Sequence, residues 1–260
     1  MTTAFSKYQG TGNDFVIFDQ MKIVANFTPD QIREICDRRF GVGADGVMFI
    51  RPSETSDFKM VYFNADGNES SMCGNGGRCL VHFALSKGYI NEKTTFEAID
   101  GIHQAEVLSK KDSIVSLHMN DVSKLEKYED GLILNTGSPH FVKFANDIEH
   151  ADIIKEGRAI RYNDDFKSEG INVNLVEMME HGIYVRTYER GVEEETLSCG
   201  TGVTASVIAA ASSGRIKGTS SRIKTRGGDL EVKFINNNNV FTNIWLIGPA
   251  VCVFKGELII

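Results

Sequence analysis

The sequence lacks the segments that are typical of membrane and nucleic-acid-binding proteins. No apolar run approaches the ~20 residues that a helix needs to cross a bilayer, and no charged segment followed by an apolar stretch opens the chain. No basic run stands out, and the formal net charge is −7. We therefore expect no nucleic acid and no membrane among the partners.

Cysteine is scarce, and its spacing argues against disulfide and metal sites. The five cysteines are an odd number at irregular spacing: Cys36, Cys73, Cys79, Cys199 and Cys252. No Cys-x-x-Cys or His-x-x-x-His pair is present, so no metal site is expected. We expect free thiols in a cytoplasmic protein. Gly10-x-Gly12 is too short for a dinucleotide-binding fingerprint.

The composition is that of an ordinary globular protein. The chain has 260 residues, of which 42% are hydrophobic and 24% are charged. This length can bury a sizeable core and favours about two domains.

Strand patterns outnumber helix patterns. Short apolar or alternating runs predict strands at residues 14–19, 47–50, 59–63, 183–188 and 230–234. Three helices are predicted, the first from a capping threonine at Thr28, with a proline and a glutamine behind it. The others follow the second and fourth cysteines, over residues 76–87 and 202–213.

Two cysteines stand in nearly the same local sequence. Cys73-Gly74-Asn75-Gly76 and Cys199-Gly200-Thr201-Gly202 lie 126 residues apart, close to half the chain length, and each precedes a predicted helix. We therefore predict an α+β fold with two domains related by duplication, each a sheet wrapped around a central helix. The polar stretch near Asn120 is the best candidate for the boundary.

The repeated motif suggests acid–base chemistry. A thiol at a helix N-terminus loses its proton more easily than a free cysteine, because unpaired N–H groups stabilise the thiolate. One thiolate and one thiol on opposite faces of a carbon form the acid–base pair that a racemase needs. Two helix N-termini can also hold the carboxylate on which negative charge develops.

Other interpretations of these residues remain open from spacing alone. A cysteine is most often a small buried hydrophobe, which is our interpretation of Cys36, Cys79 and Cys252. Two active thiols can also form a redox pair. Asn13 and Asn64 resemble turn residues. Arg190 belongs either to an exposed ion pair or to a carboxylate clamp. His140 either changes the pKa of a thiol or simply packs in the interior.

Five motifs, in order along nearly the whole chain, resemble the diaminopimelate epimerase family. They are Gly-x-Gly-Asn-Asp-Phe at 10–15, Phe-Asn-Ala-Asp-Gly at 63–67, Ser-Met-Cys-Gly-Asn-Gly-Gly-Arg-Cys at 71–79, Glu-Arg-Gly at 189–191 and Cys-Gly-Thr-Gly at 199–202. The resemblance implies a cofactor-independent cytoplasmic isomerase, commonly a homodimer. It would interconvert L,L- and meso-diaminopimelate in lysine and, in many bacteria, peptidoglycan biosynthesis.

The resemblance also implies domains and site residues. The halves would comprise residues 1–118 with 250–260 and residues 119–249, with the site in the cleft between two pseudosymmetric domains. Cys73 and Cys199 would be the acid–base pair. The implied substrate-binding residues are Asn13, Asn64, Gly74, Asn75, Asn172, Glu189, Arg190, Gly200 and Thr201. Glu189 and His140 would bias the thiol pKa values.

The chain departs from the family pattern at two positions. Ser138 stands where many members have an asparagine before Pro-His, and Gly46 where some carry a glutamine. Both changes remove a long amide that would reach substrate. Two alternatives remain: a racemase of the same fold acting on proline or hydroxyproline, and a thiol-based redox or interaction protein. The proline-acting family usually has Gly-His-Gly after its first cysteine, where this chain has Asn75.

Overall fold

The computed structural model describes residues 2–259, which form two compact units. The N-terminal unit runs to Leu117 and resumes at Gly248, and the C-terminal unit comprises His118–Ile247. The chain therefore passes from one unit to the other inside strand β8 (Ile114–Met119) and returns inside β17 (Val240–Pro249). Within the described range, no helix is long and apolar enough to span a membrane.

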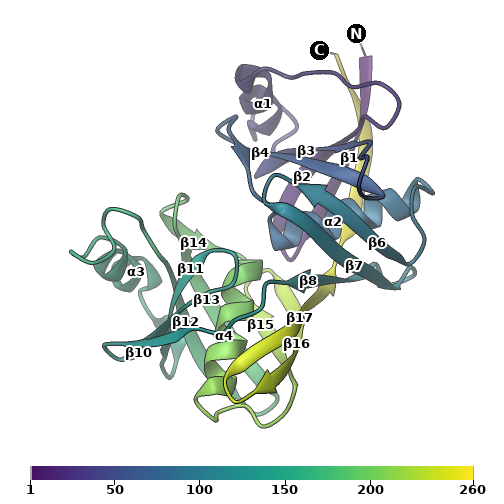
Figure 1. The fold of residues 1–260 in the computed structure, drawn as a ribbon. Helices are drawn as coiled ribbons and strands as arrows, with labels where there is room; N and C mark the ends of the chain where they lie inside the picture. Colours follow the sequence, from purple (N-terminus) through teal and green to yellow (C-terminus); the bar gives the residue numbers. More distant parts are fainter. Residues whose placement is uncertain (1, 260) are drawn as a thin grey trace. The chain divides into compact units, whose positions relative to one another are not determined.

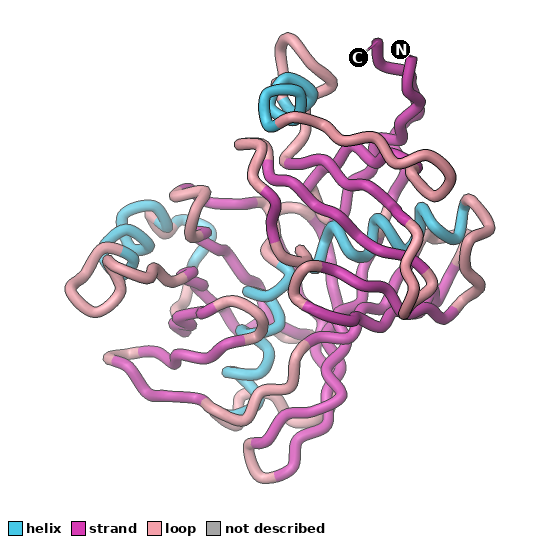
Figure 2. Tube along the Cα trace, turned by 45° about the horizontal axis from the view of Figure 1, so that its top comes forward, coloured by secondary structure: helices cyan, strands magenta, loops and turns pink. Residues whose placement is uncertain are grey.

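The N-terminal unit is built mainly from strands (Figure 1). In chain order its elements are β1 (Thr2–Gly10), β2 (Asn13–Asp19), α1 (Pro29–Cys36), β3 (Gly46–Arg51), β4 (Phe58–Asn64), β5 (Glu69–Ser70), α2 (Gly74–Ser86), β6 (Lys93–Ala98), β7 (Gly101–Ser109), the first part of β8 and β18 (Val251–Ile259). Strands β1 and β18 pair antiparallel, which brings the two ends of the chain side by side (Figure 2).

The C-terminal unit has a similar list of elements. They are β9 (Leu125–Tyr128), β10 (Gly131–Asn135), β11 (Pro139–Phe144), the 3-10 helix η1 (Ile148–His150), α3 (Ile153–Arg161), β12 (Asn172–Met179), β13 (Gly182–Glu189), β14 (Glu194–Thr196), α4 (Gly200–Ser212), β15 (Ser220–Thr225), β16 (Gly228–Asn237) and most of β17.

The strand pairings of the first unit recur in the second. In the N-terminal unit β1–β2, β3–β4, β4–β5, β6–β7 and β7–β8 are antiparallel, whereas β2–β3 and β4–β6 are parallel. In the C-terminal unit β10–β11, β12–β13, β13–β14, β15–β16 and β16–β17 are antiparallel, whereas β11–β12 and β13–β15 are parallel. The two units are therefore topological duplicates.

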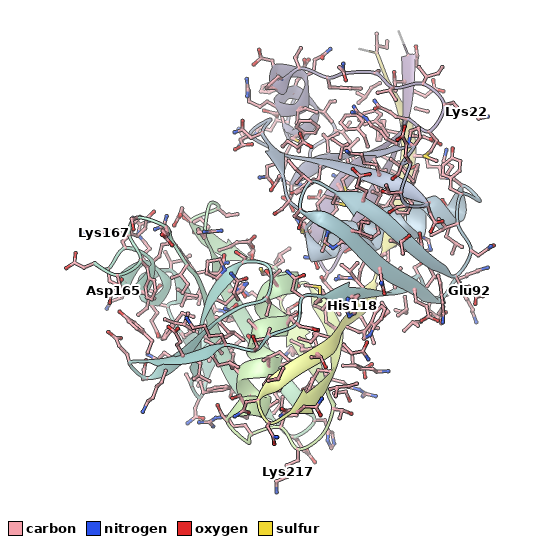
Figure 3. The ribbon with its side chains drawn as sticks, viewed as in Figure 1. Lys22, Glu92, His118, Asp165, Lys167 and Lys217 are labelled. Carbon is pink, nitrogen blue, oxygen red and sulfur yellow. The ribbon has the colours of Figure 1, made fainter. Side chains whose placement is uncertain are left out.

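Each unit buries the helix that follows its cysteine motif. In α2 nearly every residue from Gly74 to Ala84 is buried, and in α4 the residues from Gly202 to Ala210 are buried. Helix α4, small or apolar nearly all round, lies among the strands of its unit (Figure 1). Side chains fill the interior of each unit, while charged residues such as Lys22 and Lys167 project outward (Figure 3).

The predicted α+β class is confirmed, with mostly antiparallel sheet and few helices. Two details differ from the sequence-based expectation. The helices begin at Gly74 and Gly200, two residues earlier than predicted, so the cysteines themselves are the N-cap residues. Helix α3 was not predicted. In addition, Cys252 lies on β18 and is only partly buried, so it is not the core residue that we expected, whereas Cys36 and Cys79 are buried.

Candidate active site

Both motif cysteines occupy the N-cap position of a buried helix. Cys73 has φ −91° and ψ 128° before α2, and Cys199 has φ −115° and ψ 114° before α4. Neither helix has a side-chain cap hydrogen bond at its start. The N–H groups of a first helical turn have no partner within their own helix, and each sulfur lies at the positive end of a helix dipole.

An amide lies beside the sulfur of Cys73. The Sγ atom donates to Oδ1 of Asn13 at 3.5 Å, and Nδ2 of Asn75 donates to the same oxygen at 3.5 Å. The Asn13 Nδ2 group donates to Oδ2 of Asp45 at 2.6 Å. Because a carboxylate only accepts, the amide nitrogen of Asn13 must face Asp45 and its oxygen must face Cys73.

Charged residues hold that arrangement in place. The Arg38 guanidinium bonds to Oδ1 of Asp14 at 2.8 Å and to Oδ1 of Asp45 at 2.7 Å, while Lys7 pairs with Asp14 at 2.7 Å. Partial burial opposes ionisation of Asp14, but Arg38 and Lys7 outweigh it and lower the pKa of this carboxyl to about 2. The start of β2, which carries Asn13, is thus anchored by ion pairs.

A fully buried arginine lies within the first turns of α2. Arg78 is 0% exposed and forms no ion pair with a carboxylate in the described part of the chain. Its guanidinium donates to the Gly74 carbonyl at 3.2 Å and to Oδ1 of Asn75 at 3.0 Å. Burial lowers the pKa of Arg78 to about 10, so the group stays charged at neutral pH.

The charge of Arg78 interacts electrostatically with the neighbouring cysteines Cys79 and Cys73. An uncompensated buried cation is costly, and anions are its natural partners. Burial raises the pKa of the neighbouring Cys79 thiol to about 12, so that thiol stays neutral. Arg78 therefore adds a positive charge at the start of α2 and orients the Asn75 amide that contacts Asn13.

A polar network lies beside Cys199 in the other unit. The Cys199 sulfur and the Thr201 hydroxyl are 3.4 Å apart, and the Thr201 carbonyl accepts from the Thr136 hydroxyl at 2.8 Å. A methyl group at Gly202 would lie 2.5 Å from Oδ1 of Asn174 and 3.3 Å from Cβ of Cys199. Position 202 must be glycine because the strand side chains approach the helix this closely.

His140 is part of this network and is completely buried. Its Nδ1 atom lies 3.1 Å from Nδ2 of Asn174, whose oxygen accepts from the Thr187 hydroxyl at 2.9 Å. Burial, with a smaller contribution from the charge of Arg190, lowers the pKa of His140 to about 3. The imidazole is therefore neutral at physiological pH.

Two of the expected substrate-binding residues, Asn172 and Arg190, lie together in the C-terminal unit. Asn172 donates to the Ser138 hydroxyl at 2.9 Å and to the Pro139 carbonyl at 3.0 Å, and its oxygen accepts from the Arg190 backbone at 2.9 Å. The Arg190 guanidinium donates to the Glu169 carbonyl at 3.0 Å and to Ser138 at 3.4 Å. The Ser138 hydroxyl thus accepts from both Asn172 and Arg190, at the position where many family members have an asparagine.

The space around Gly46 is filled by a neighbouring strand. A methyl group there would lie 2.5 Å from both the Phe63 carbonyl and the ring of Tyr62. A glutamine in this backbone would need the tyrosine to move. Asn64 faces Gly46 across the β3–β4 pair, at the end of β4, and is half-buried.

The structure thus brings the predicted residues together within each unit. Asn13, Gly74 and Asn75 surround Cys73, and Gly200 and Thr201 adjoin Cys199. Glu189 ends β13 just before Arg190. Sequence reasoning missed Arg78, Asn174 and Thr187; only Arg78 carried a signal, because it lies inside the first cysteine motif. Within residues 2–259 no cluster of three or more histidine, cysteine or acidic residues is arranged to hold a metal ion.

Comparison with known proteins assigns the family. The sequence model of the diaminopimelate epimerase family matches residues 5–125 and 132–253. This chain belongs to the diaminopimelate epimerase family. A family protein from Flavobacterium psychrophilum is 48% identical over 251 residues, covering 96% of this chain and 97% of that protein. One from Aquifex aeolicus is 40% identical over 273 residues, covering 98% and 97%. The protein is therefore an isomerase of the epimerase class.

Solved structures show the same fold at low sequence identity. A phenazine biosynthesis protein of the PhzF family from Bacillus anthracis matches with a TM-score of 0.77 at 15% identity, and the match covers 100% of both chains. A hydroxyproline epimerase from Agrobacterium vitis matches with a TM-score of 0.68 at 14% identity, covering 99% of this chain and 91% of that one. At this identity the match supports the fold alone, so it does not select a substrate.

Proposed function

We propose that this protein interconverts L,L- and meso-diaminopimelate by a two-cysteine acid–base mechanism, without pyridoxal phosphate or metal. The observation that carries the proposal is the duplicated helix start, in which Cys73 and Cys199 are the N-cap residues of α2 and α4. Membership of the family supports the substrate, since the relatives carry the name diaminopimelate epimerase.

The reaction transfers two protons and needs no redox partner. One sulfur, as thiolate, takes the α-proton, and the electron pair of the broken C–H bond remains on the substrate as a carbanion delocalised into the carboxylate. The other sulfur, as thiol, gives its proton to the opposite face of the same carbon. The configuration is inverted, and the two cysteines finish with exchanged protonation states, so the reverse reaction uses the same groups.

The developing charge on the carboxylate requires donors that are already oriented. Backbone N–H groups in the first turns of α2 and α4, at Gly74, Asn75, Gly200 and Thr201, are suited to this task. Such donors stabilise a transition state without reorganisation. We assign Asn13 to the surroundings of the reacting centre because its oxygen lies 3.5 Å from the sulfur of Cys73.

We assign recognition of the second amino-carboxylate to the distal residues. Arg190 offers a planar fork for a carboxylate, and Asn64 and Glu189 end strands that lead to the cysteine motifs. The Asn172 amide nitrogen donates to Ser138 and Pro139, and its oxygen accepts from the Arg190 backbone. We therefore assign Asn172 the role of holding the backbone of Arg190 in position for the substrate.

Membership of the family supports a proposal for the biological setting. We propose a place in lysine and peptidoglycan precursor biosynthesis, a cytoplasmic location and a homodimer as the assembly. We further propose that residues 1–118 with 250–260 and residues 119–249 are the two epimerase halves.

A substrate assay in deuterium oxide tests the proposal. The reduced protein is incubated with L,L-diaminopimelate, and α-deuterium incorporation and stereochemistry are followed in the presence of a chelator. We expect the meso isomer to form. Activity on proline alone would identify a proline-type racemase of the same fold, and no α-exchange with any amino acid would leave a thiol-based redox or interaction protein.

A further inference from the structure

Three buried side chains of the C-terminal unit form a hydrogen-bonded chain that the proposed reaction does not explain. Thr187 donates to Oδ1 of Asn174 at 2.9 Å, and Nδ2 of Asn174 meets Nδ1 of His140 at 3.1 Å. His140 and Asn174 are 0% exposed and Thr187 is 3% exposed. A buried polar network of this kind has to be satisfied group by group.

The orientation of the Asn174 amide is fixed by a backbone carbonyl. Its Nδ2 group also lies 3.1 Å from the carbonyl oxygen of Phe141. A carbonyl can only accept, so the amide nitrogen has to be on this side and the oxygen on the side of Thr187. The exchange of nitrogen and oxygen that is often ambiguous for asparagine is therefore excluded here.

The amide orientation determines the tautomer of His140. Since Nδ2 of Asn174 is a donor, Nδ1 of His140 must be the acceptor, and the ring proton lies on Nε2. A second proton on Nδ1 would face the amide N–H. The low pKa of about 3 agrees with a ring that stays neutral. His140 therefore acts neither as a cation nor as a base through Nδ1.

The remaining ring nitrogen is buried with nothing to bind. Nε2 of His140 has no hydrogen-bond partner in the described part of the chain. Leaving a buried donor unsatisfied costs about 1–3 kcal/mol, so an anion that accepts a hydrogen bond from this nitrogen would be stabilised there. The network lies against the first turn of α4, because a Cβ atom at Gly202 would be 2.5 Å from Asn174 and 3.3 Å from the Thr187 hydroxyl.

We propose that Asn174 and Thr187 are positioning residues that hold His140 as a neutral Nε2–H donor for an anion at the start of α4. The anion is a substrate carboxylate or a cysteine thiolate, which present the same acceptor chemistry to the ring. This inference rests on the proposed function and makes it more specific. It assigns His140 a donor role and explains why two further strands contribute polar side chains beneath this helix.

Nuclear magnetic resonance tests the tautomer directly, without substrate. Long-range proton–nitrogen correlation spectra of protein labelled at its six histidines distinguish the two neutral tautomers and the imidazolium. The His140 signals are assigned by their loss in His140→Gln. We expect the neutral Nε2–H pattern between about pH 5 and about pH 8. An Nδ1–H pattern or an imidazolium in that range would overturn the proposal.

Substitutions of Asn174 test the positioning role. Asn174→Asp replaces the donor facing Nδ1 by an acceptor, so the proton should move to Nδ1 or the ring should become charged. Asn174→Leu removes the constraint with little change in volume. Met48→Leu, at the equivalent position of the other unit, is the matched control for packing, because volume-conserving apolar exchanges usually cost less than about 1.5 kcal/mol.

Kinetic measurements then identify the anion. Loss of one oriented donor costs about 100-fold in rate where charge develops. If the anion is the carboxylate, Asn174→Leu raises KM or lowers kcat without changing the pH at which Cys199 is alkylated by iodoacetamide. If it is the thiolate, that pH rises. A folded Asn174→Leu variant with unchanged tautomer, kinetics and alkylation profile would contradict the proposal. An enzyme inactive on diaminopimelate would refute the proposed function and leave the tautomer result standing.

Discussion

The same three strand positions lie beneath the buried helix of each unit, and their side chains differ in chemistry. In the N-terminal unit they are Phe15, Met48 and Tyr62, and in the C-terminal unit His140, Asn174 and Thr187. The register establishes the equivalence: Phe15 pairs with Gly46 and Met48 with Tyr62, as His140 pairs with Asn172 and Asn174 with Thr187. Met48 approaches Gly76 as Asn174 approaches Gly202, and each glycine is three residues after its cysteine.

The comparison shows how a duplicated framework makes two equivalent groups chemically different. In the unit of Cys73, the strand residues beneath α2 are Phe15, Met48 and Tyr62, and the helix itself carries the buried guanidinium of Arg78. In the unit of Cys199, the residues beneath α4 form a polar but neutral network. A formal charge and a hydrogen-bond donor affect a thiolate to different extents. The two thiols therefore have distinct surroundings although their helix starts are alike.

The largest expected effect is loss of either sulfur. Cys73→Ala and Cys199→Ala should each reduce epimerisation by at least about 1,000-fold, because each removes one partner of the proton transfer. The far-ultraviolet circular dichroism should be unchanged, since each substitution removes a single sulfur atom at a helix start. Substantial activity in one of the two variants would show that this cysteine is dispensable and that the pair is wrongly assigned.

The two glycines beneath the helices should respond unequally to alanine. In Gly202→Ala the new methyl meets Oδ1 of Asn174, which three hydrogen-bonding groups hold in place, so we expect a loss of about 1–3 kcal/mol in the free energy of unfolding. In Gly76→Ala it meets the terminal methyl of Met48, which can turn away. The helix propensity of alanine offsets part of that cost.

Urea denaturation of both glycine variants measures this difference. We expect Gly76→Ala to lose less than about 1 kcal/mol. Equal losses of unfolding free energy in the two variants would mean that the polar network beneath α4 is no more rigid than the Met48 side chain beneath α2.

Replacement of Arg78 should affect the chemistry of Cys73 more than the stability of the fold. Arg78→Met removes a costly buried charge while filling a similar volume, and such exchanges are often neutral or stabilising. It also removes the donor that orients Asn75 and the positive charge at the start of α2. We expect the pH at which Cys73 is alkylated to rise and kcat to fall about tenfold.

Arg78→Lys is the control for charge without the planar fork, and Cys199 is the internal control for alkylation. If Arg78→Met changes the alkylation of both cysteines equally, or of neither, the guanidinium has no specific effect on Cys73.

The last expected effect concerns stability at acid pH and is absent at neutral pH. The unfolded chain protonates His140 near its ordinary pKa of 6.5, whereas the folded chain does so only near 3. Between these values the unfolded state binds more protons, so stability falls as the pH is lowered, by up to about 1.4 kcal/mol per pH unit from this group. His140→Phe, which places the residue of the other unit here, should lose that dependence.

Urea denaturation at several pH values between these limits compares the wild type with His140→Phe. Parallel pH profiles for the two proteins would show that His140 is equally protonated in the folded and unfolded states.

Local signals predicted helices α1, α2 and α4 and five of the strands, whereas tertiary contacts explain the helix that was missed. The capping box at Thr28 was visible in four residues, and both of its hydrogen bonds with Gln31 are present. Helix α3 has an N-cap at Asp152 but carries Gly157 in its interior, which weakens the pattern. Gly157 is needed because Cβ would lie 2.4 Å from the ring of Tyr188. That requirement comes from a strand distant in sequence.

The same reason explains what was predicted of the site. Cys73 and Cys199 were found because their helix starts are local motifs. The strand residues beneath α2 and α4 were not found, because their equivalence depends on strand register. The sequences around Phe15 and His140 do not resemble each other. The duplication is therefore plain in the strand pairings and nearly absent from the sequence.

The pattern of isotope labelling at early turnover tests the two-cysteine mechanism most directly. L,L-Diaminopimelate is converted in deuterium oxide for a small fraction of the reaction, and product and unreacted substrate are analysed separately at the α-carbon. Two thiols acting from opposite faces predict deuterium in the meso product and almost none in the recovered substrate. Retention of the original hydrogen in the product, or equal labelling of both species, would show that a single group removes and returns the proton.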